Sequence, residues 1–429
     1  MSKRDVLITG VGVISPLGKN TGENWAKLRK LETGICHYPN DGLPEFMQYI
    51  GKIDDYHLPD SISPRQRGQL KFLNRAALFG LSSVDEALPL ESTHLDHIEP
   101  GRRSLFVASG EHNQIGAEFM YPAIKDTLGK EWKDTDIDKF NRSMMDRFNP
   151  FFLLDSLHNN LFSFLSAYTG FMGPGTSLSS MPPCGNQALA LACRDIKLNK
   201  ADIAVAVGYG SWIADIARYE LQGVGRLSAC SAGAASYRPL DVRRDGFITG
   251  EGGAAIVLES AESAKRRGAQ VFGKVLATSN SFALNEDDNT AVPPMVNNRN
   301  MATAIKRSGC SQSEIAFLIS QGDGTQAGDR SELESIGSVL SDPSIPVCAL
   351  KPYTGHMGPA SDLVEIIFGI LAVKEGYIPA TLNFTETEKA FSNLNISGSP
   401  IMTEKTIFLS TSYGASGQAS TVLIDARKS

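Results

Sequence analysis

Residues 184–207, CGNQALALACRDIKLNKADIAVAV, are the most informative stretch for the fold. Small and apolar residues recur from Cys184 to Ile196 with the spacing of a buried helix face. Residues 201–207, ADIAVAV, then form a nearly continuous apolar run, which is typical of a strand covered on both faces of its sheet. A helix followed directly by such a strand indicates an α/β fold.

The same alternation extends over the whole chain. Between the apolar runs lie helical patterns such as Leu363 to Val373, where Val364, Ile367, Phe368 and Leu371 repeat at helical spacing. The other predicted strands are 6–8, 104–108, 254–258, 317–319, 346–349, 407–409 and 420–424.

A change of composition near residue 260 divides the chain into two α/β halves, 1–260 and 261–429. No Pro/Ser-rich linker marks the change, so we expect the halves to form one body. Residues 111–165 resemble an insertion into the first half, because they lack strand character and are richer in Phe, Met and Asn. This segment is either ordinary packing or a dimer-facing segment that lines an apolar tunnel.

The bulk composition narrows the classes of protein. The 429 residues are 42% hydrophobic and 21% charged with a formal net charge of −6, which does not suggest a nucleic-acid binder. No window holds 18 continuous apolar residues, and the first residues resemble a strand rather than a secretory signal. Six dispersed cysteines without a CxxC pair fit a reduced, cytoplasmic protein. The seven histidines show no convincing metal spacing; only His94 and His97 lie close together, among acidic residues.

Several separated motifs resemble those of the β-ketoacyl-ACP synthases (ketosynthases), and they occur in the family's order. Residues 321–325, QGDGT, stand where the family has an HGTGT-like loop, and residues 413–418, YGASGQ, stand where it has a Gly-Phe-Gly-Gly loop. The motifs that match more fully are ITGVGVISPLG at 8–18, RPLDVRRDGF at 238–247 with Gly250-Glu251-Gly252 beyond it, and LKPYTGH at 350–356.

The resemblance covers the whole chain and implies a thiolase-like fold of αβαβα layers built from two related halves. Active members form a carbon–carbon bond by decarboxylative condensation. A cysteine takes the acyl chain from an acyl carrier protein, and two histidines assist decarboxylation of the extender. Covalent catalysis of this kind depends on a thiolate near a helix N-terminus and on backbone N–H groups that hold the oxyanion.

The nucleophile position is occupied by a residue that cannot perform this chemistry. The segment GPGTSLSSMPPCGNQ at 173–187 aligns with the family's nucleophile segment without gaps and places Pro182 where the cysteine belongs. Proline has neither a thiol nor a backbone N–H, and in the family the nucleophile's N–H is one oxyanion donor. Loss of one such donor costs about 2.7–4 kcal/mol in a working enzyme.

Cys184 is a candidate alternative nucleophile. We expect the helix to start at the prolines, and two residues turn a helix by about 200°, so the Cys184 side chain should point away from the site. A small buried cysteine is the preferred interpretation. A reactive thiol in the first helical turn is the other interpretation.

The remaining catalytic positions are partly altered. Gln321 occupies the first histidine position and cannot titrate near neutral pH. The second histidine and the lysine are kept as His356 and Lys351, and an ion pair between Lys351 and Glu332 is expected to orient the loop. Ala415 stands at the position of the gating phenylalanine. We interpret His356 as a packing and hydrogen-bonding residue, because its catalytic partners are missing.

The resemblance therefore suggests a catalytically inactive chain-length-factor-like subunit of a type II polyketide or aryl-polyene system. Such a subunit would pair with an active ketosynthase and shape the tunnel for the growing chain. It would bind no cofactor, and the phosphopantetheine arm of an acyl carrier protein would visit chiefly the partner. Chain-length factors commonly carry glutamine at the nucleophile position, so Pro182 departs from them. Tunnel candidates by analogy are Asn113, Gln114, Ile115, Gly116 and Phe119.

Two alternatives remain open from the sequence. One is a divergent acyltransferase or hydrolase that uses Cys184 or His356. The other is a regulatory or scaffolding homodimer without a ketosynthase partner.

Overall fold

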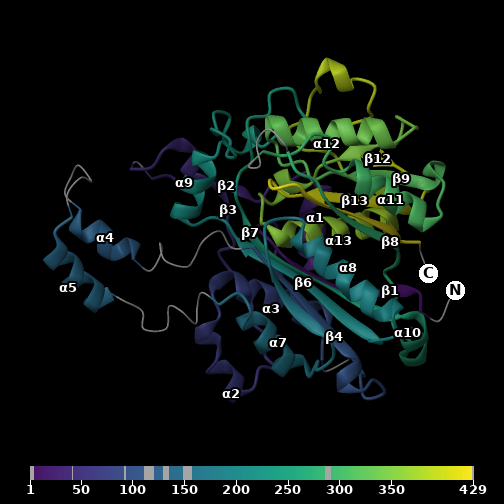
Figure 1. Cartoon of the computed structure of the whole chain (residues 1–429), viewed down its shortest axis with the longest axis horizontal. Helices are drawn as coiled ribbons and strands as arrows, with labels where there is room; N and C mark the ends of the chain where they lie inside the picture. Colours follow the sequence, from purple (N-terminus) through teal and green to yellow (C-terminus); the bar gives the residue numbers. More distant parts are fainter. Residues whose placement is uncertain are drawn as a thin grey trace.

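One mixed sheet of ten strands runs through the molecule (Figure 1). The computed structural model describes residues 4–40, 42–90, 93–110, 120–128, 135–147, 157–285 and 291–427. Along the sheet the strand order is β10-β9-β13-β14-β8-β1-β7-β6-β4-β5. The strands are β1 (Val6–Ile14), β4 (Arg103–Ser109), β5 (Gly175–Ser179), β6 (Ile203–Ser211), β7 (Glu251–Ser260), β8 (Gly273–Phe282), β9 (Ile315–Ile319), β10 (Val347–Cys348), β13 (Ile407–Tyr413) and β14 (Gln418–Asp425).

The two ends of this sheet repeat one topology. In the first half β1 and β6 each pair antiparallel with β7, and β4 pairs parallel with both β6 and β5. In the second half β8 and β13 each pair antiparallel with β14, and β9 pairs parallel with both β13 and β10. The halves meet where β1 pairs with β8. The prediction of two related halves is confirmed, while the exact boundary at residue 260 stays a prediction; β7 ends there.

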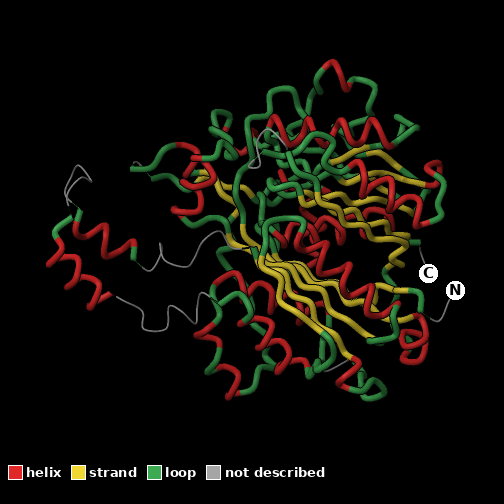
Figure 2. The backbone as a smooth tube through the Cα atoms, in the orientation of Figure 1, coloured by secondary structure: helices red, strands yellow, loops and turns green. Residues whose placement is uncertain are grey.

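Helices cover the sheet in three layers, which Figure 2 shows in red on both sides of the yellow strands. α3 and α7 pack on the outer face of the first half, and α11 and α12 pack on the outer face of the second half. α8 and α13 lie between the halves, within the largest apolar cluster. The helices are α1 (Thr21–Arg29), α2 (Pro64–Arg67), α3 (Arg75–Ala87), α4 (Tyr121–Thr127), α5 (Ile137–Arg147), α7 (Asn160–Thr169), α8 (Cys184–Lys197), α9 (Asp215–Gly223), α10 (Ala261–Arg267), α11 (Asn298–Ser308), α12 (Gln326–Val339) and α13 (Pro359–Glu375).

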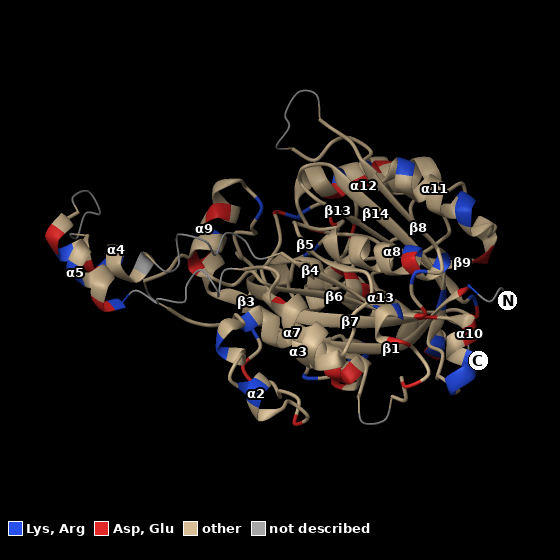
Figure 3. Ribbon diagram, turned by 60° about the horizontal axis from the view of Figure 1, so that its bottom comes forward, with Lys and Arg blue, Asp and Glu red and all other residues tan. Residues whose placement is uncertain are grey.

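The layers account for the composition of these segments. β7 is buried along its whole length, because helices cover both of its faces. α13 is also buried on nearly all sides, as expected for a helix between the two halves of the sheet. Figure 3 shows that Lys, Arg, Asp and Glu lie mainly on the outer helices and loops, whereas the strands are mostly uncharged. The predicted thiolase-like fold of αβαβα layers is confirmed.

Two short ribbons complete the strands: β2 (Ile35–His37) pairs with β3 (Tyr49–Gly51), and β11 (Tyr377–Ile378) pairs with β12 (Ile401–Met402). All eight apolar runs that the sequence predicts as strands overlap a strand of the ten-stranded sheet. β5 and β8 were not predicted. β5 is short, polar and half-buried at the edge of the sheet, and β8 alternates between buried and partly buried residues.

The predicted insertion, residues 111–165, contains helices of two kinds. α4 and α5 lie against each other and stand away from the main body in Figures 1 and 2. α7 begins within the same segment, but its Leu161, Phe164 and Leu165 belong to the core of the first half. All five tunnel candidates, Asn113, Gln114, Ile115, Gly116 and Phe119, lie outside the described residues.

Two further properties concern the chain as a whole. Among the helices of the described residues, none is long and apolar enough to cross a membrane. All six cysteines are free thiols, of which Cys184, Cys193, Cys230 and Cys348 are buried.

Glycine allows a close approach between α8 and α13. A Cβ atom on Gly185 would lie 2.3 Å from the Pro359 carbonyl oxygen and 2.9 Å from Cβ of Asp362. A Cβ on Gly208 of β6 would lie 2.5 Å from the same carbonyl oxygen. Neither backbone can move without shifting a buried helix, so both positions require glycine for steric reasons.

We therefore expect Gly185→Ala to lower the free energy of unfolding by about 1–3 kcal/mol through overpacking. Gly337→Ala in α12 is the matched control, because no heavy atom lies within 4 Å of its added Cβ. The control should raise stability by about 0.5–1 kcal/mol, because alanine favours the helix. Urea unfolding followed by circular dichroism measures both variants. Equal midpoints for the two would contradict this account of the α8–α13 contact.

Candidate functional site

The site lies where the turn before α8 meets the loops that follow β9 and β13. Pro182 and Pro183 lie between β5 and α8, and both are buried. α8 begins at Cys184, with Pro183 as its cap residue and no capping side chain. The prediction that the prolines form the first helical positions was therefore wrong. The backbone of Pro182 packs closely against the loop after β13. A Cβ atom added to Gly414 in that loop would lie only 2.2 Å from the Pro182 carbonyl oxygen.

A small cavity brings together four positions that the sequence assigned to the catalytic site. Pro182, Gln321, His356 and Ala415 all line it, although they come from four separate segments of the chain. Its volume is about 20 Å³, which is room for a single water molecule. The other lining residues are Met181, Trp212, Arg226, Phe247, Asp323, Tyr413 and Gly414.

His356 is held as a neutral ring between aromatic side chains. Its ring stacks on Trp212 with centroids 4.6 Å apart, and the Phe247 ring lies 4.8 Å away. The Gly358 N–H donates to His356 Nδ1 over 3.1 Å, so the proton of the neutral ring is on Nε2. Burial, with help from nearby Lys351 and Arg226, lowers the pKa of His356 well below its usual value. The ring is therefore uncharged at neutral pH.

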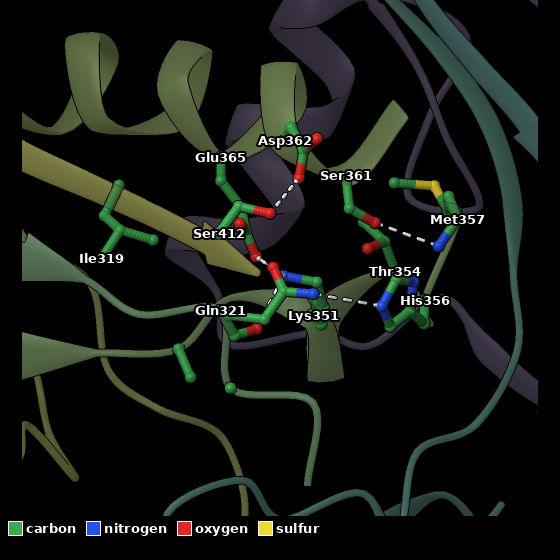
Figure 4. Close-up of polar contacts among 12 residues, drawn as sticks. Ile319, Gln321, Lys351, Thr354, His356, Met357, Ser361, Asp362, Glu365 and Ser412 are labelled. Atoms are coloured by element: carbon green, nitrogen blue, oxygen red, sulfur yellow. Dashed lines mark hydrogen bonds and ion pairs between the residues drawn. The ribbon is translucent and has the colours of Figure 1, made fainter. Parts of the chain in front are cut away.

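Gln321 faces His356 across the cavity (Figure 4). The Gln321 Nε2 atom lies 3.4 Å from His356 Nε2, and Gln321 Oε1 accepts from Lys351 Nζ over 3.1 Å. The lysine fixes the amide orientation, so Gln321 presents its NH₂ group to an imidazole nitrogen that also carries a proton. Two N–H donors thus meet at the cavity, and an acceptor such as a water oxygen would satisfy them better than they satisfy each other.

Lys351 pairs with Glu365 of α13. Lys351 Nζ lies 2.9 Å from Glu365 Oε1 and also donates to the Gln321 backbone oxygen over 2.6 Å. The predicted Lys351–Glu332 ion pair was therefore wrong. Burial raises the pKa of Glu365 to about 8, although the neighbouring Lys351 lowers it.

Glu332 holds the loop that follows β9 by accepting hydrogen bonds from the backbone of that loop. Its carboxylate accepts from the N–H groups of Gln321 and Gly322 over 2.8 and 3.0 Å. It also accepts from Thr411 Oγ1 over 2.7 Å. Burial raises the pKa of Glu332 despite these donors. Glu332 therefore orients the Gln321 loop by hydrogen bonds, which is the role that the sequence assigned to an ion pair.

The side-chain carboxylate of Asp362, which belongs to α13, lies at the N-terminus of α8. Its Oδ2 accepts from the N–H groups of Gly185 and Asn186 over 2.9 and 3.4 Å, and its Oδ1 accepts from Ser412 Oγ over 2.8 Å. Burial raises the pKa of Asp362 to about 6. The first N–H groups of the helix are thus used within the protein, so they are not free to hold an oxyanion.

Cys184 lies in the core below this turn. It is fully buried and belongs to the apolar cluster around α8 and α13. Burial raises the pKa of its thiol to about 12, and the charge of Asp362 acts in the same direction. The thiol is therefore protonated at neutral pH and remote from solvent, whereas a reactive cysteine needs the opposite surroundings.

Sequence reasoning missed Asp362, Glu365 and Trp212. Asp362 and Glu365 are two carboxylates three residues apart in an otherwise apolar helix, and buried charges of this kind normally have partners. That pattern was a usable signal. No such signal pointed to Trp212, because its neighbours in the structure, His356 and Phe247, are distant in the sequence. No group of three or more metal-binding side chains occurs in the part of the chain that the structure describes.

The Lys351–Glu365 pair predicts a pH-dependent loss of stability. Lys351→Met should lower the free energy of unfolding by about 3–5 kcal/mol, since it leaves a buried carboxyl without its partner. A carboxyl whose pKa is raised in the folded state favours folding most at low pH, and this contribution is lost as pH rises. Loss of the lysine raises that pKa further. Both proteins then lose stability in parallel until Glu365 ionises near pH 8 in the parent, so the deficit should grow between about pH 7 and pH 9.

Urea unfolding at both pH values measures the deficit. The double variant Lys351→Met/Glu365→Gln is compared with Glu365→Gln alone, and the difference between these two should not change with pH, because neither carries the titrating carboxyl. A deficit of equal size at both pH values in the single variant would contradict the pairing.

Comparison with known proteins finds similarity to 3-oxoacyl-[acyl-carrier-protein] synthases. It is 28% identical over 456 residues to the mitochondrial 3-oxoacyl-[acyl-carrier-protein] synthase of Arabidopsis thaliana, covering 98% of this chain and 93% of that protein. It is 24% identical to 3-oxoacyl-[acyl-carrier-protein] synthase 1 of Escherichia coli K12, covering 97% and 98%. Its fold matches a solved structure described as the ishigamide ketosynthase/chain length factor, with a TM-score of 0.82, 22% identity and full coverage of both chains.

Two family models together cover most of the sequence. The N-terminal domain of β-ketoacyl synthases matches residues 3–264, and the C-terminal domain matches residues 276–385. The first model alone spans more than half of the chain, and the ten-stranded, three-helix-layer fold agrees with it. This chain belongs to the β-ketoacyl synthase family.

Proposed function

We propose that this chain is a catalytically inactive, chain-length-factor-like subunit that pairs with an active ketosynthase and shapes the acyl or polyketide tunnel. The observation that carries the proposal is Pro182, which stands between β5 and α8 in a cavity of about 20 Å³. A side chain without a thiol cannot take an acyl group from a carrier protein.

The surroundings of Pro182 support the same conclusion. Gln321 cannot exchange a proton near neutral pH. His356 is stacked on Trp212 beside the tilted Phe247 ring, and burial lowers its pKa well below the usual value. Asp362 occupies the donors at the start of α8. The change therefore extends beyond the thiol to the missing N–H of residue 182 and to the acid–base pair.

The edge of the sheet offers a surface for a partner subunit. Among the described residues β5 pairs only with β4, so its other side is an open edge. The Leu105 N–H donates to Pro174 O, and the Ser180 N–H donates to Ser109 O. Even-numbered residues of β5 thus bond to β4, and the odd-numbered residues Gly175, Ser177 and Ser179 direct their backbone groups outward. An exposed strand edge is a template for pairing with another chain.

The chemistry of the partner follows from the family. Structures similar in fold include one described as a ketosynthase/chain length factor and one described as a type II acyl-carrier protein with its ketosynthase bound to a hexaketide. We infer that the active ketosynthase subunit supplies the cysteine. The phosphopantetheine arm of an acyl carrier protein then delivers the acyl chain chiefly to that subunit.

Pairing through β5 is testable with a backbone substitution. Co-expression with an intact ketosynthase from the same gene neighbourhood should give a complex of heterodimer mass on size exclusion. Ser179→Pro should weaken this complex, because proline removes an outward N–H without breaking the β4–β5 ladder. Ser179→Ala is the matched control and should leave it intact. A chain that forms a dimer by itself and ignores the ketosynthase would instead support a scaffolding homodimer.

The alternative enzyme that uses Cys184 predicts a covalent adduct. Incubation with acylated carrier protein and measurement of the intact mass should show no acyl group on this chain, because the Cys184 thiol is buried and its pKa is raised to about 12. A Cys184→Ala variant serves as the reference for any background mass. An adduct that disappears in this variant would overturn the proposal and favour the acyltransferase or hydrolase.

A further inference from the structure

A second cavity adjoins the small one, and Arg226 lies between them. The outer cavity has a volume of about 460 Å³ and is partly open to solvent. Arg226 lines both cavities, whereas Asp245 and Thr325 line only the outer one and Gln321 and His356 only the inner one. A molecule that reached the inner cavity from the outer one would have to pass Arg226.

Asp323 faces Arg226 from the loop after β9. Arg226 Nη1 and Asp323 Oδ2 are 3.9 Å apart, and both side chains are largely buried, with exposures of 16% and 6%. Asp323 lines the inner cavity and stands in the QGDGT segment, where the similar family loop has a threonine. Burial reduces the screening of the attraction between these opposite charges.

Both members of the pair are held in place by their own segments. The second carboxylate oxygen of Asp323 accepts from the Thr325 N–H over 2.8 Å and from Thr325 Oγ1 over 2.7 Å. The Arg226 N–H donates to Leu221 O over 3.0 Å, and the Phe247 N–H donates to Arg226 O over 3.0 Å. The ion pair thus joins two segments, and hydrogen bonds hold the Asp323 carboxylate and the Arg226 backbone in place within them.

The inner cavity is polar and has the size of one water. The N–H groups of Gln321 and His356 meet there, and Tyr413, whose buried hydroxyl has no hydrogen-bond partner, also lines it. A water molecule needs two to four polar partners and about this volume. An acyl thioester is far larger than the space available.

We infer that Arg226 and Asp323 form a charged partition between the two cavities, which a molecule in the larger cavity would have to displace to reach position 182. This second barrier acts independently of the missing thiol. An extended thioester arm in the outer cavity would stop at the guanidinium, even if residue 182 could react. The inference concerns access alone, so it does not depend on which partner the chain has.

A thiol placed behind the partition can report access. Pro182→Cys introduces it into the inner cavity, and the probe is the 2-pyridyl disulfide of pantetheine. The thiolate attacks the probe's disulfide, forms a mixed disulfide with pantetheine and releases pyridine-2-thione. Fragment-ion mass spectrometry separates position 182 from Cys184 and gives the rate of labelling.

Labelling should be about tenfold faster when Arg226→Ala is added, the factor that corresponds to about 1.4 kcal/mol of opening free energy. Asp323→Asn should accelerate it in the same direction by removing the attraction. Arg330→Ala is the matched control, because Arg330 is an exposed arginine that pairs with Glu388 away from both cavities, and it should leave the rate unchanged.

Equal labelling rates with and without Arg226→Ala would overturn the partition. If Pro182→Cys lowers the thermal midpoint too far for labelling, Ala415→Cys places the thiol on another wall of the same cavity, and the same comparison decides. Co-elution with a ketosynthase is a separate measurement, so failure of the partition and failure of the proposed pairing are distinguishable.

Discussion

The close contact between the N-terminal ends of α8 and α13 is the constraint on which the rest of the structure depends. Gly185 and Gly208 let the first turn of α13 approach the backbones of α8 and β6, and Asp362 then accepts hydrogen bonds from the start of α8 and from Ser412 of β13. One carboxylate thereby connects a helix of the first half with a helix and a strand of the second. The site lies at this junction, where the turn before α8 meets loops of the second half.

The same junction explains why the scaffold of the site persists although its chemistry is altered. Lys351, Glu365, Glu332 and Asp362 are buried, and each satisfies a partner in another segment. Removal of one member of such a network leaves a buried charge or donor unpaired, which typically costs several kcal/mol. The residues that faced the substrate carry no such penalty. Proline, glutamine and alanine at positions 182, 321 and 415 fill space without leaving a charge behind.

The altered site also has a consistent physical character. Proline at position 182 and glutamine at position 321 are side chains that do not titrate. His356 remains, but as a neutral ring stacked on Trp212, with the Phe247 ring tilted against it. Asp323 brings a carboxylate opposite Arg226 at the boundary of the two cavities. The result is a packed polar centre that supports the loops around it, in a position where active relatives need an open pocket for a thioester.

The sequence alone determined the layered α/β fold and the proline at position 182. Nearly continuous apolar strands can only belong to covered sheets, and a proline lacks a thiol and an N–H wherever it is placed. The sequence did not determine β5 and β8, since an edge strand and a half-exposed strand lack that apolar signature. Nor could it decide the partner of Lys351, because Glu332 and Glu365 are both carboxylates distant in the chain. Only the tertiary structure selected Glu365, started α8 at Cys184 and placed Arg226 between two cavities. These choices depend on which distant segments meet, and no local pattern of residues encodes that.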